Sequence, residues 1–144
     1  MYGDEQDLKS LFKGDRLPTL DEGIAAMAAR HPGLRLLLLF GSQARGDVAP
    51  GSDWDLGYQA TADVDPASLL ADLVGLLGTD RIDLVDLDRA SAQLRFRAAG
   101  EGRVLYQADP GNFPRFWTAA VSFWCDAGPL LRAGYEDVLA RLPR

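Results

Sequence analysis

The order of apolar and polar residues along the chain indicates strands and helices in alternation. The unbroken apolar run Leu36 to Phe40 has the length and composition of a buried strand. Residues 66–77 instead carry leucines and a valine at helical spacing, and Asp65 before Pro66 provides a helix cap with proline at the first helical position. Across the chain these patterns predict helices over about 20–30, 41–45, 66–77, 88–97 and 113–141, the last broken near Gly128-Pro129, and strands over about 36–40, 52–59, 81–87 and 102–107.

Helices that alternate with strands predict a layered α/β (α+β) architecture. The chain has 144 residues, 47% of them hydrophobic, which is enough for one hydrophobic core. We therefore expect a single domain over 1–144. It would consist of an N-terminal arm (1–19), a core (20–110) and a C-terminal helical segment (111–144).

Charge and cysteine content narrow the class of protein. The formal net charge is −6, so tight sequence-independent binding to DNA or RNA is not expected, because such binding requires a basic surface. Cys125 is the only cysteine, so the chain cannot form an internal disulfide, which fits a reducing cytoplasm. We interpret Cys125 as a small buried apolar residue. The N-terminus lacks the features of a signal peptide, and no apolar run approaches the roughly 20 residues that span a bilayer, so we expect a cytoplasmic protein without a membrane partner.

Two aspartates separated by one residue stand at the start of the second predicted strand. Residues i and i+2 of a strand point to the same face, so Asp53 and Asp55 project together and Trp54 projects the other way. Two ionised carboxylates this close to each other need a cation or a shared proton. An all-oxygen pair suits Mg²⁺, which leaves coordination positions for water and substrate phosphates.

A tight turn follows the first predicted strand. Gly41 and Ser42 open a short helix that includes Arg45. Glycine lets the backbone approach a ligand closely, and the free N–H groups at a helix start favour a phosphate. Ser42 can donate its hydroxyl to a phosphate oxygen. Arg45 is a candidate phosphate ligand, with a structural ion pair or a solvated position as the alternative.

The two features together follow a known pattern. Gly41-Ser42, ten residues and Asp53-x-Asp55 resemble the signature of the DNA-polymerase-β-like nucleotidyltransferase superfamily. The fuller stretch LFGSQARGDVAPGSDWDLG resembles the small MNT-type members, the minimal nucleotidyltransferases. The resemblance implies a small mixed sheet backed by helices, ATP as the substrate and two Mg²⁺ ions.

A third carboxylate is needed when two metal ions clamp the attacking and the leaving oxygen, because two ligands rarely hold both ions. The run RIDLVDL offers Asp83 and Asp86, which strand alternation places on opposite faces. The superfamily carries its third acid early in such a strand, which matches Asp83. The resemblance therefore implies that Asp53, Asp55 and Asp83 are the catalytic metal ligands and that Asp86 faces away.

The resemblance also implies a partner. Many MNT-type proteins are antitoxins of HEPN/MNT toxin–antitoxin pairs of type VII, which transfer AMP from ATP to a HEPN toxin, and the C-terminal run FWCDAGPLLRAGYEDVLARL resembles their final helix. Two other functions stay open. One is an aminoglycoside-type small-molecule nucleotidyltransferase, although little chain after Pro110 remains for a substrate domain. The other is a non-catalytic antitoxin that occludes its toxin.

Two features outside the motif have plain structural interpretations. His31, the only histidine, lies in the turn that ends the first predicted helix, where a surface position is typical. The last helix carries aromatic residues that fit core packing, with a protein interface as the alternative. These are Phe113, Phe116, Trp117, Phe123 and Trp124.

Overall fold

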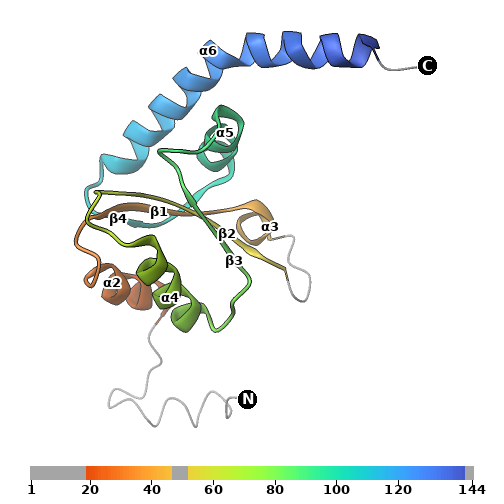
Figure 1. Ribbon diagram of the computed structural model, residues 1–144. Coiled ribbons are helices and arrows are strands. Elements are labelled where there is room, and N and C mark those ends of the chain that lie inside the picture. The colour runs from red at the N-terminus through yellow and green to blue at the C-terminus, as the bar shows by residue number, and fades with distance from the viewer. Residues whose placement is uncertain (1–18, 47–51, 142–144) are drawn as a thin grey trace, which may run out of the picture.

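One sheet between two layers of helices forms the body of the molecule in the computed structural model, which describes residues 19–46 and 52–141 (Figure 1). The helices are α2 (Leu20–Ala28), α3 (Gly41–Arg45), α4 (Pro66–Leu77), α5 (Ala92–Glu101) and α6 (Asn112–Arg141), and the strands are β1 (Leu34–Phe40), β2 (Trp54–Ala60), β3 (Ile82–Asp86) and β4 (Arg103–Gln107). The predicted α/β (α+β) class is confirmed. The predicted N-terminal arm, apart from Thr19, lies outside the described residues.

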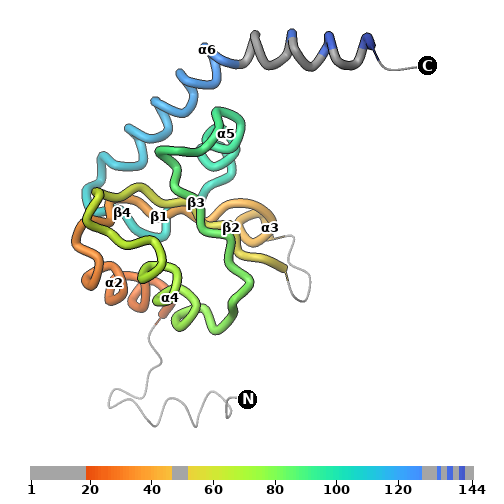
Figure 2. The backbone as a smooth tube through the Cα atoms, viewed as in Figure 1, coloured from red at the N-terminus to blue at the C-terminus, as the bar shows by residue number. Residues whose placement is uncertain are grey.

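The sheet is mixed, with the strand order β3-β2-β1-β4. Strand β1 pairs antiparallel with both β2 and β4. Strands β2 and β3 pair in parallel, which requires the crossover that α4 provides between them. The backbone trace shows the end of β1 leading directly into α3 at one edge of the body, next to the start of β2 (Figure 2).

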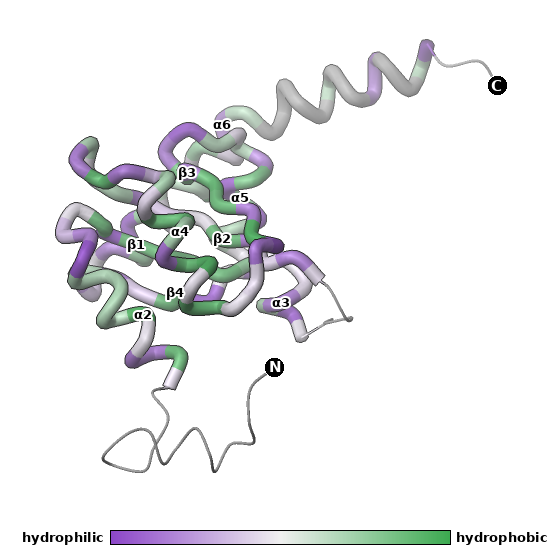
Figure 3. Tube along the Cα trace, turned by 60° about the horizontal axis from the view of Figure 1, so that its bottom comes forward, coloured by the Kyte–Doolittle hydropathy of each residue, from purple (hydrophilic) through white to green (hydrophobic). Residues whose placement is uncertain are grey.

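Strand β1 is covered on both faces, which explains why its sequence is an unbroken apolar run rather than an alternating one. Leu37 and Leu39 belong to the cluster formed with α2 and α4, whereas Leu36 and Leu38 belong to the cluster formed with α5 and α6. Hydrophobic segments accordingly gather along the strands and α4 in Figure 3. The helices contribute Ile24, Met27, Leu69 and Leu73 on one face and Ala98, Ala99, Phe116 and Ala120 on the other.

Side-chain caps fix where the helices start. Thr19 forms a capping box with Glu22 at the start of α2. The predicted cap of α4 is present, since Asp65 accepts a hydrogen bond from the backbone N–H of Ala67. Helix α5 begins later than the predicted residue 88, because the hydroxyl of Ser91 accepts a hydrogen bond from the N–H of Leu94. Residues 87–89 form a turn instead.

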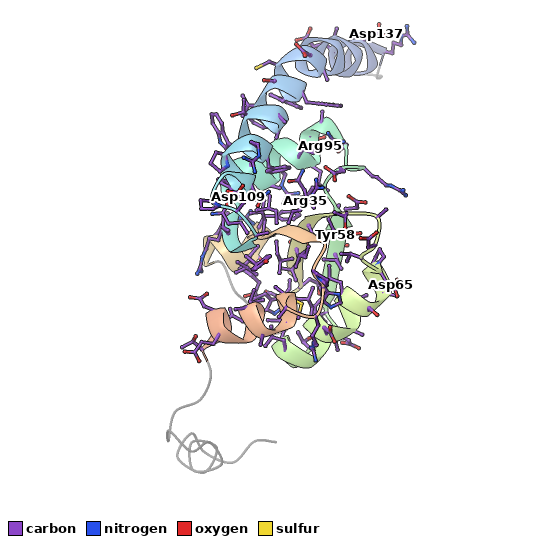
Figure 4. The ribbon with its side chains drawn as sticks, turned by 90° about the vertical axis from the view of Figure 1, so that its left-hand side faces the viewer. Arg35, Tyr58, Asp65, Arg95, Asp109 and Asp137 are labelled. Atoms are coloured by element: carbon purple, nitrogen blue, oxygen red, sulfur yellow. The ribbon has the colours of Figure 1, made fainter. Side chains whose placement is uncertain are left out.

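Helix α6 is continuous, so the predicted break near Gly128-Pro129 is wrong. A single proline removes one helical hydrogen bond, which bends a helix without ending it. Figure 1 shows α6 changing direction along its length and extending away from the sheet. Asp137, labelled in Figure 4, lies near this distal end and forms an ion pair with Arg141. Within the described part of the chain, no helix combines the length and apolar content needed to cross a bilayer.

The aromatic residues of α6 divide between core and surface. Phe116 is buried in the cluster under α5, and Trp124 stacks on Phe96 of α5 with 5.1 Å between ring centroids. Trp117 and Phe123 are 47% and 43% exposed, so core packing does not extend to them. Cys125 is exposed as well, and its predicted burial is wrong, because α6 packs against the body along one face only.

His31 is buried, which corrects the predicted surface position. Its side chain is 8% exposed, and Nε2 lies 2.6 Å from Oδ2 of Asp72 on α4. The same carboxylate forms an ion pair of 3.2 Å with Arg30. The turn after α2 therefore packs its histidine against α4 instead of exposing it, and an acidic partner satisfies the buried ring.

Candidate active site

The pairing of β2 with β3 brings two of the predicted acids together. Asp55 and Asp83 are direct partners in the parallel register, so their side chains leave the same face of the sheet on neighbouring strands. Asp55 is also the register partner of Phe40, which packs with α5 and α6. The two acids therefore lie on the α5 face. Asp86, three residues further along β3, faces the other way and accepts a hydrogen bond from the N–H of Asp88.

Asp53 lies just before β2 and on the same side as Asp55 by strand alternation. Two hydrogen bonds hold this entry to the strand. The N–H of Trp54 donates to the carbonyl oxygen of Arg81 at 2.9 Å, and Nε2 of Gln43 on α3 donates to the carbonyl oxygen of Ser52 at 3.4 Å. Asp53 and Asp83 are both exposed and Asp55 is half-buried, so solvent and ligands can reach the acids.

Gly41 connects the end of β1 to α3 directly beside the acids. Its φ of +72° lies in the left-handed region, which glycine adopts without strain. A Cβ atom at this position would overlap Oδ2 of Asp55. The backbone of the turn and the Asp55 carboxylate are therefore in contact, and Ser42 lies in the first turn of α3. The preceding Phe40 provides no side-chain cap, which leaves the first N–H groups of this helix without a cap from that residue.

Two arginines and a glutamate border the acids. Nη1 of Arg45 on α3 donates to Oε2 of Glu101 on α5 at 3.1 Å, so the ion pair given as the alternative role of Arg45 is present. Nη2 of Arg97 lies 3.8 Å from the same oxygen, and its guanidinium carbon lies 5.7 Å from the ring centroid of Phe40. Sequence reasoning missed Arg97 and Glu101. The one local signal is their spacing of four residues on a helix, which does not reveal that they approach α3.

The environment of Asp55 opposes its ionisation. Burial raises the pKa of Asp55, and the neighbouring carboxylates of Asp83 and Asp53 raise it further, whereas Arg97 and Arg45 act in the opposite direction. A carboxyl group that is partly removed from water and faces two other acids is more stable when a cation is bound or when it is protonated. This is the electrostatic property expected of a cation site.

Replacing Asp55 with asparagine is expected to raise the thermal midpoint of the protein in metal-free and nucleotide-free buffer at pH 7. Folding favours the protonated carboxyl because its folded-state pKa is raised, so ionisation at pH 7 destabilises the wild type. The gain should disappear as the pH falls through the folded-state pKa toward the ordinary value of 3.8, where the wild-type group is also uncharged. Thermal unfolding at several pH values measures this.

The control for this stability prediction is Asp63→Asn, which changes an exposed loop carboxylate and should leave the midpoint unchanged. A lower midpoint for Asp55→Asn at pH 7 would contradict the prediction and would indicate that the carboxylate stabilises the fold.

The acidic donors fit Mg²⁺. In the described residues, no three His, Cys, Asp or Glu side chains already form a complete metal cage. Mg²⁺ does not require one, since it commonly binds through one or two carboxylates and takes water and phosphate oxygens as its other ligands. Asp53, Asp55 and Asp83 supply only oxygen donors. The pKa of Asp55 is raised by burial first and then by the negative charges of Asp83 and Asp53, and a divalent cation would neutralise these charges.

Comparisons with known proteins agree on one family. Residues 22–111 match the family described as polymerase beta, nucleotidyltransferase. The protein adenylyltransferase MntA of Aphanizomenon flos-aquae is 30% identical over 118 residues, which cover 71% of this chain and 78% of that protein.

Solved structures extend the likeness to the fold. A chain in the crystal structure of a toxin–antitoxin with AMP-PNP has a TM-score of 0.71 and 27% identity, and the match covers 83% of this chain and 98% of that one. A chain in the structure of the tri-AMPylated Shewanella oneidensis HEPN toxin in complex with its MNT antitoxin has a TM-score of 0.65 and 25% identity, with 83% and 96% covered.

Proposed function

Because the chain belongs to the polymerase beta nucleotidyltransferase family, we propose that it is the antitoxin of a toxin–antitoxin pair and transfers AMP from ATP to its cognate HEPN toxin. The observation that supports this most directly is the contact between the Gly41 turn and Asp55, whose register partner is Asp83. It joins a candidate phosphate site to a candidate metal site in one place. In this proposal the reaction takes place in the cytoplasm, where ATP and Mg²⁺ are both present.

The roles of the site residues follow from their positions. Gly41 admits the triphosphate close to the backbone, Ser42 donates its hydroxyl to a phosphate oxygen, and Arg45 offsets phosphate charge. Asp53, Asp55 and Asp83 would hold two Mg²⁺ ions. When bound, these ions neutralise the phosphates and the oxygens that attack and leave.

The reaction itself is a displacement at phosphorus. An oxygen of the toxin attacks the α-phosphorus of ATP and loses its proton, and the bond to pyrophosphate breaks. The chain contributes mainly by positioning and by charge, as is general for phosphoryl transfer. The proton passes to water. A cation held by Asp83 and Asp55, which lie on the same face of neighbouring strands, would favour its loss by stabilising the oxygen anion that forms.

Incubation of the full chain with its cognate toxin, ATP and Mg²⁺ is expected to add the mass of at least one adenylyl group to the toxin. Intact-mass spectrometry of the toxin measures this, with reactions lacking ATP or Mg²⁺ as controls. A stable complex without a mass change would contradict transfer and would favour an antitoxin that occludes its toxin. Transfer to an aminoglycoside, with the toxin unmodified, would favour a small-molecule enzyme.

A further inference from the structure

Helix α5 brings a basic side chain to the acids, on the face of the sheet that they occupy. Ala98 and Ala99 are buried against β1, and their small side chains let α5 approach the sheet closely. The residue before them, Arg97, thereby places its guanidinium carbon 5.7 Å from the ring centroid of Phe40. Phe40 is the register partner of Asp55, so Arg97 lies beside the acid at the centre of the site.

The ion pair of Arg97 with Glu101 is long, and both side chains are accessible to solvent. The distance between Nη2 and Oε2 is 3.8 Å, and the two side chains are 48% and 30% exposed. Glu101 has a shorter contact, 3.1 Å, with Arg45. Exposed ion pairs of this kind contribute little to stability, so exchanging Glu101 for another anion costs Arg97 little.

With ATP and two Mg²⁺ ions bound, the net charge of the site would favour a further positive side chain such as Arg97. The negative charge of ATP is matched by two Mg²⁺ ions, and the three aspartates then leave the site negative. Arg97 lowers the pKa of Asp55 more than Arg45 does, as expected for a guanidinium close to this carboxylate. A guanidinium also matches the geometry of phosphate oxygens, to which it donates two parallel hydrogen bonds.

We propose that Arg97 is a nucleotide-binding residue that moves from Glu101 to the phosphates of ATP and contacts them from the α5 side. This inference rests on the proposed function, because it takes ATP as the substrate. Two arginines from different elements would then contact the phosphates, Arg45 from α3 and Arg97 from α5. The contact is with phosphate and not with adenine, since Arg97 lies beside the acids.

Replacing Arg97 with glutamine is expected to weaken the binding of Mg²⁺–ATP about tenfold, as expected for the loss of a charge-assisted contact. Arg97→Lys should lose less, since it keeps the charge but not the paired donors. The affinity for adenosine, measured by competition, should not change. Isothermal titration calorimetry with the full chain measures the binding, and thermal unfolding checks that each variant is folded.

Arg89→Gln is the matched control. It removes an arginine that is 88% exposed and forms a long ion pair, 3.8 Å, with Asp86 on the face away from the acids. This variant should bind Mg²⁺–ATP as the wild type does. A folded Arg97→Gln variant with wild-type affinity for Mg²⁺–ATP, or with an equal loss for adenosine, would overturn the inference. So would an effect confined to the Michaelis constant for the toxin.

The same experiment separates this inference from the proposed function. Wild-type binding of Mg²⁺–ATP without transfer to the toxin would contradict the function while leaving the effect of Arg97→Gln on binding measurable. Transfer that is lost in Asp55→Asn but unchanged in Arg97→Gln, together with unchanged binding, would support the function and reject the role of Arg97. If the wild type does not bind Mg²⁺–ATP, both assignments fail.

Discussion

Asp55→Asn is expected to slow AMP transfer to the toxin by about a thousandfold. Charge neutralisation by metal ions contributes several kcal/mol to such reactions, and each 1.4 kcal/mol corresponds to about tenfold in rate. Asn keeps the shape of the side chain but removes the negative charge, so the loss reflects ligation and not packing. Single-turnover transfer to the toxin, followed by mass spectrometry, measures the rate.

The loss of AMP transfer should be confined to aspartates on the sheet face that Asp55 occupies. Asp53→Asn and Asp83→Asn should also lose most of the activity, whereas Asp86→Asn should keep it. Asp86 belongs to the same strand as Asp83 but points to the opposite face, where it caps a turn through the N–H of Asp88. Equal losses in Asp83→Asn and Asp86→Asn would mean that the strand is sensitive to any change, and would argue against a metal role for Asp83.

Most of this site could be located from the sequence because its geometry is local. The positions of Gly41, Asp53 and Asp55 follow from a strand, a turn and a second strand within residues 36–59, and the alternation of a strand decides which side chains share a face. Placing Asp83 in the site required more than strand alternation. Its place next to Asp55 depends on the register of a parallel pair, which alternation alone does not provide.

The parts of the site that escaped prediction depend on tertiary packing. Arg97 and Glu101 look like an ordinary helical pair, and only the packing of α5 on β1 brings them to the acids. Burial of His31 has the same origin, because Asp72 lies 41 residues away along the chain. Cys125 shows the reverse case, a residue of an often buried type that lies exposed on a helix face which the described residues leave uncovered.

Helix ends show how local competition limits prediction. Both Asp88 and Ser91 are good candidates to cap α5, and the chain uses Ser91. Arg95 is one reason. Its side chain, labelled in Figure 4, belongs to α5. It donates to the carbonyl oxygens of Ala90 and Asp88, which stabilises the turn that precedes the helix.

Gly41→Ala is expected to reduce both stability and AMP transfer. A residue with a Cβ atom at φ +72° is strained by about 1–2 kcal/mol. Its Cβ would also overlap Oδ2 of Asp55, so the carboxylate must move or the turn must open. Because a displacement of about 1 Å in a catalytic group can cost about a hundredfold in rate, we expect a loss of that order. Denaturant unfolding and single-turnover transfer measure the two effects.

Gly46→Ala separates backbone strain from the displacement of Asp55. Gly46 also has a positive φ, +81°, but among the residues that the structure describes its Cβ would meet no atom within 4 Å. It should therefore show only the strain, about 1–2 kcal/mol, and transfer AMP at nearly the wild-type rate. The difference between the two variants isolates the contact of the turn with the acid. If both variants lose activity equally, flexibility at the ends of α3 matters more than the position of Asp55, and the close approach of Gly41 to the carboxylate is not what brings phosphate and metal sites together.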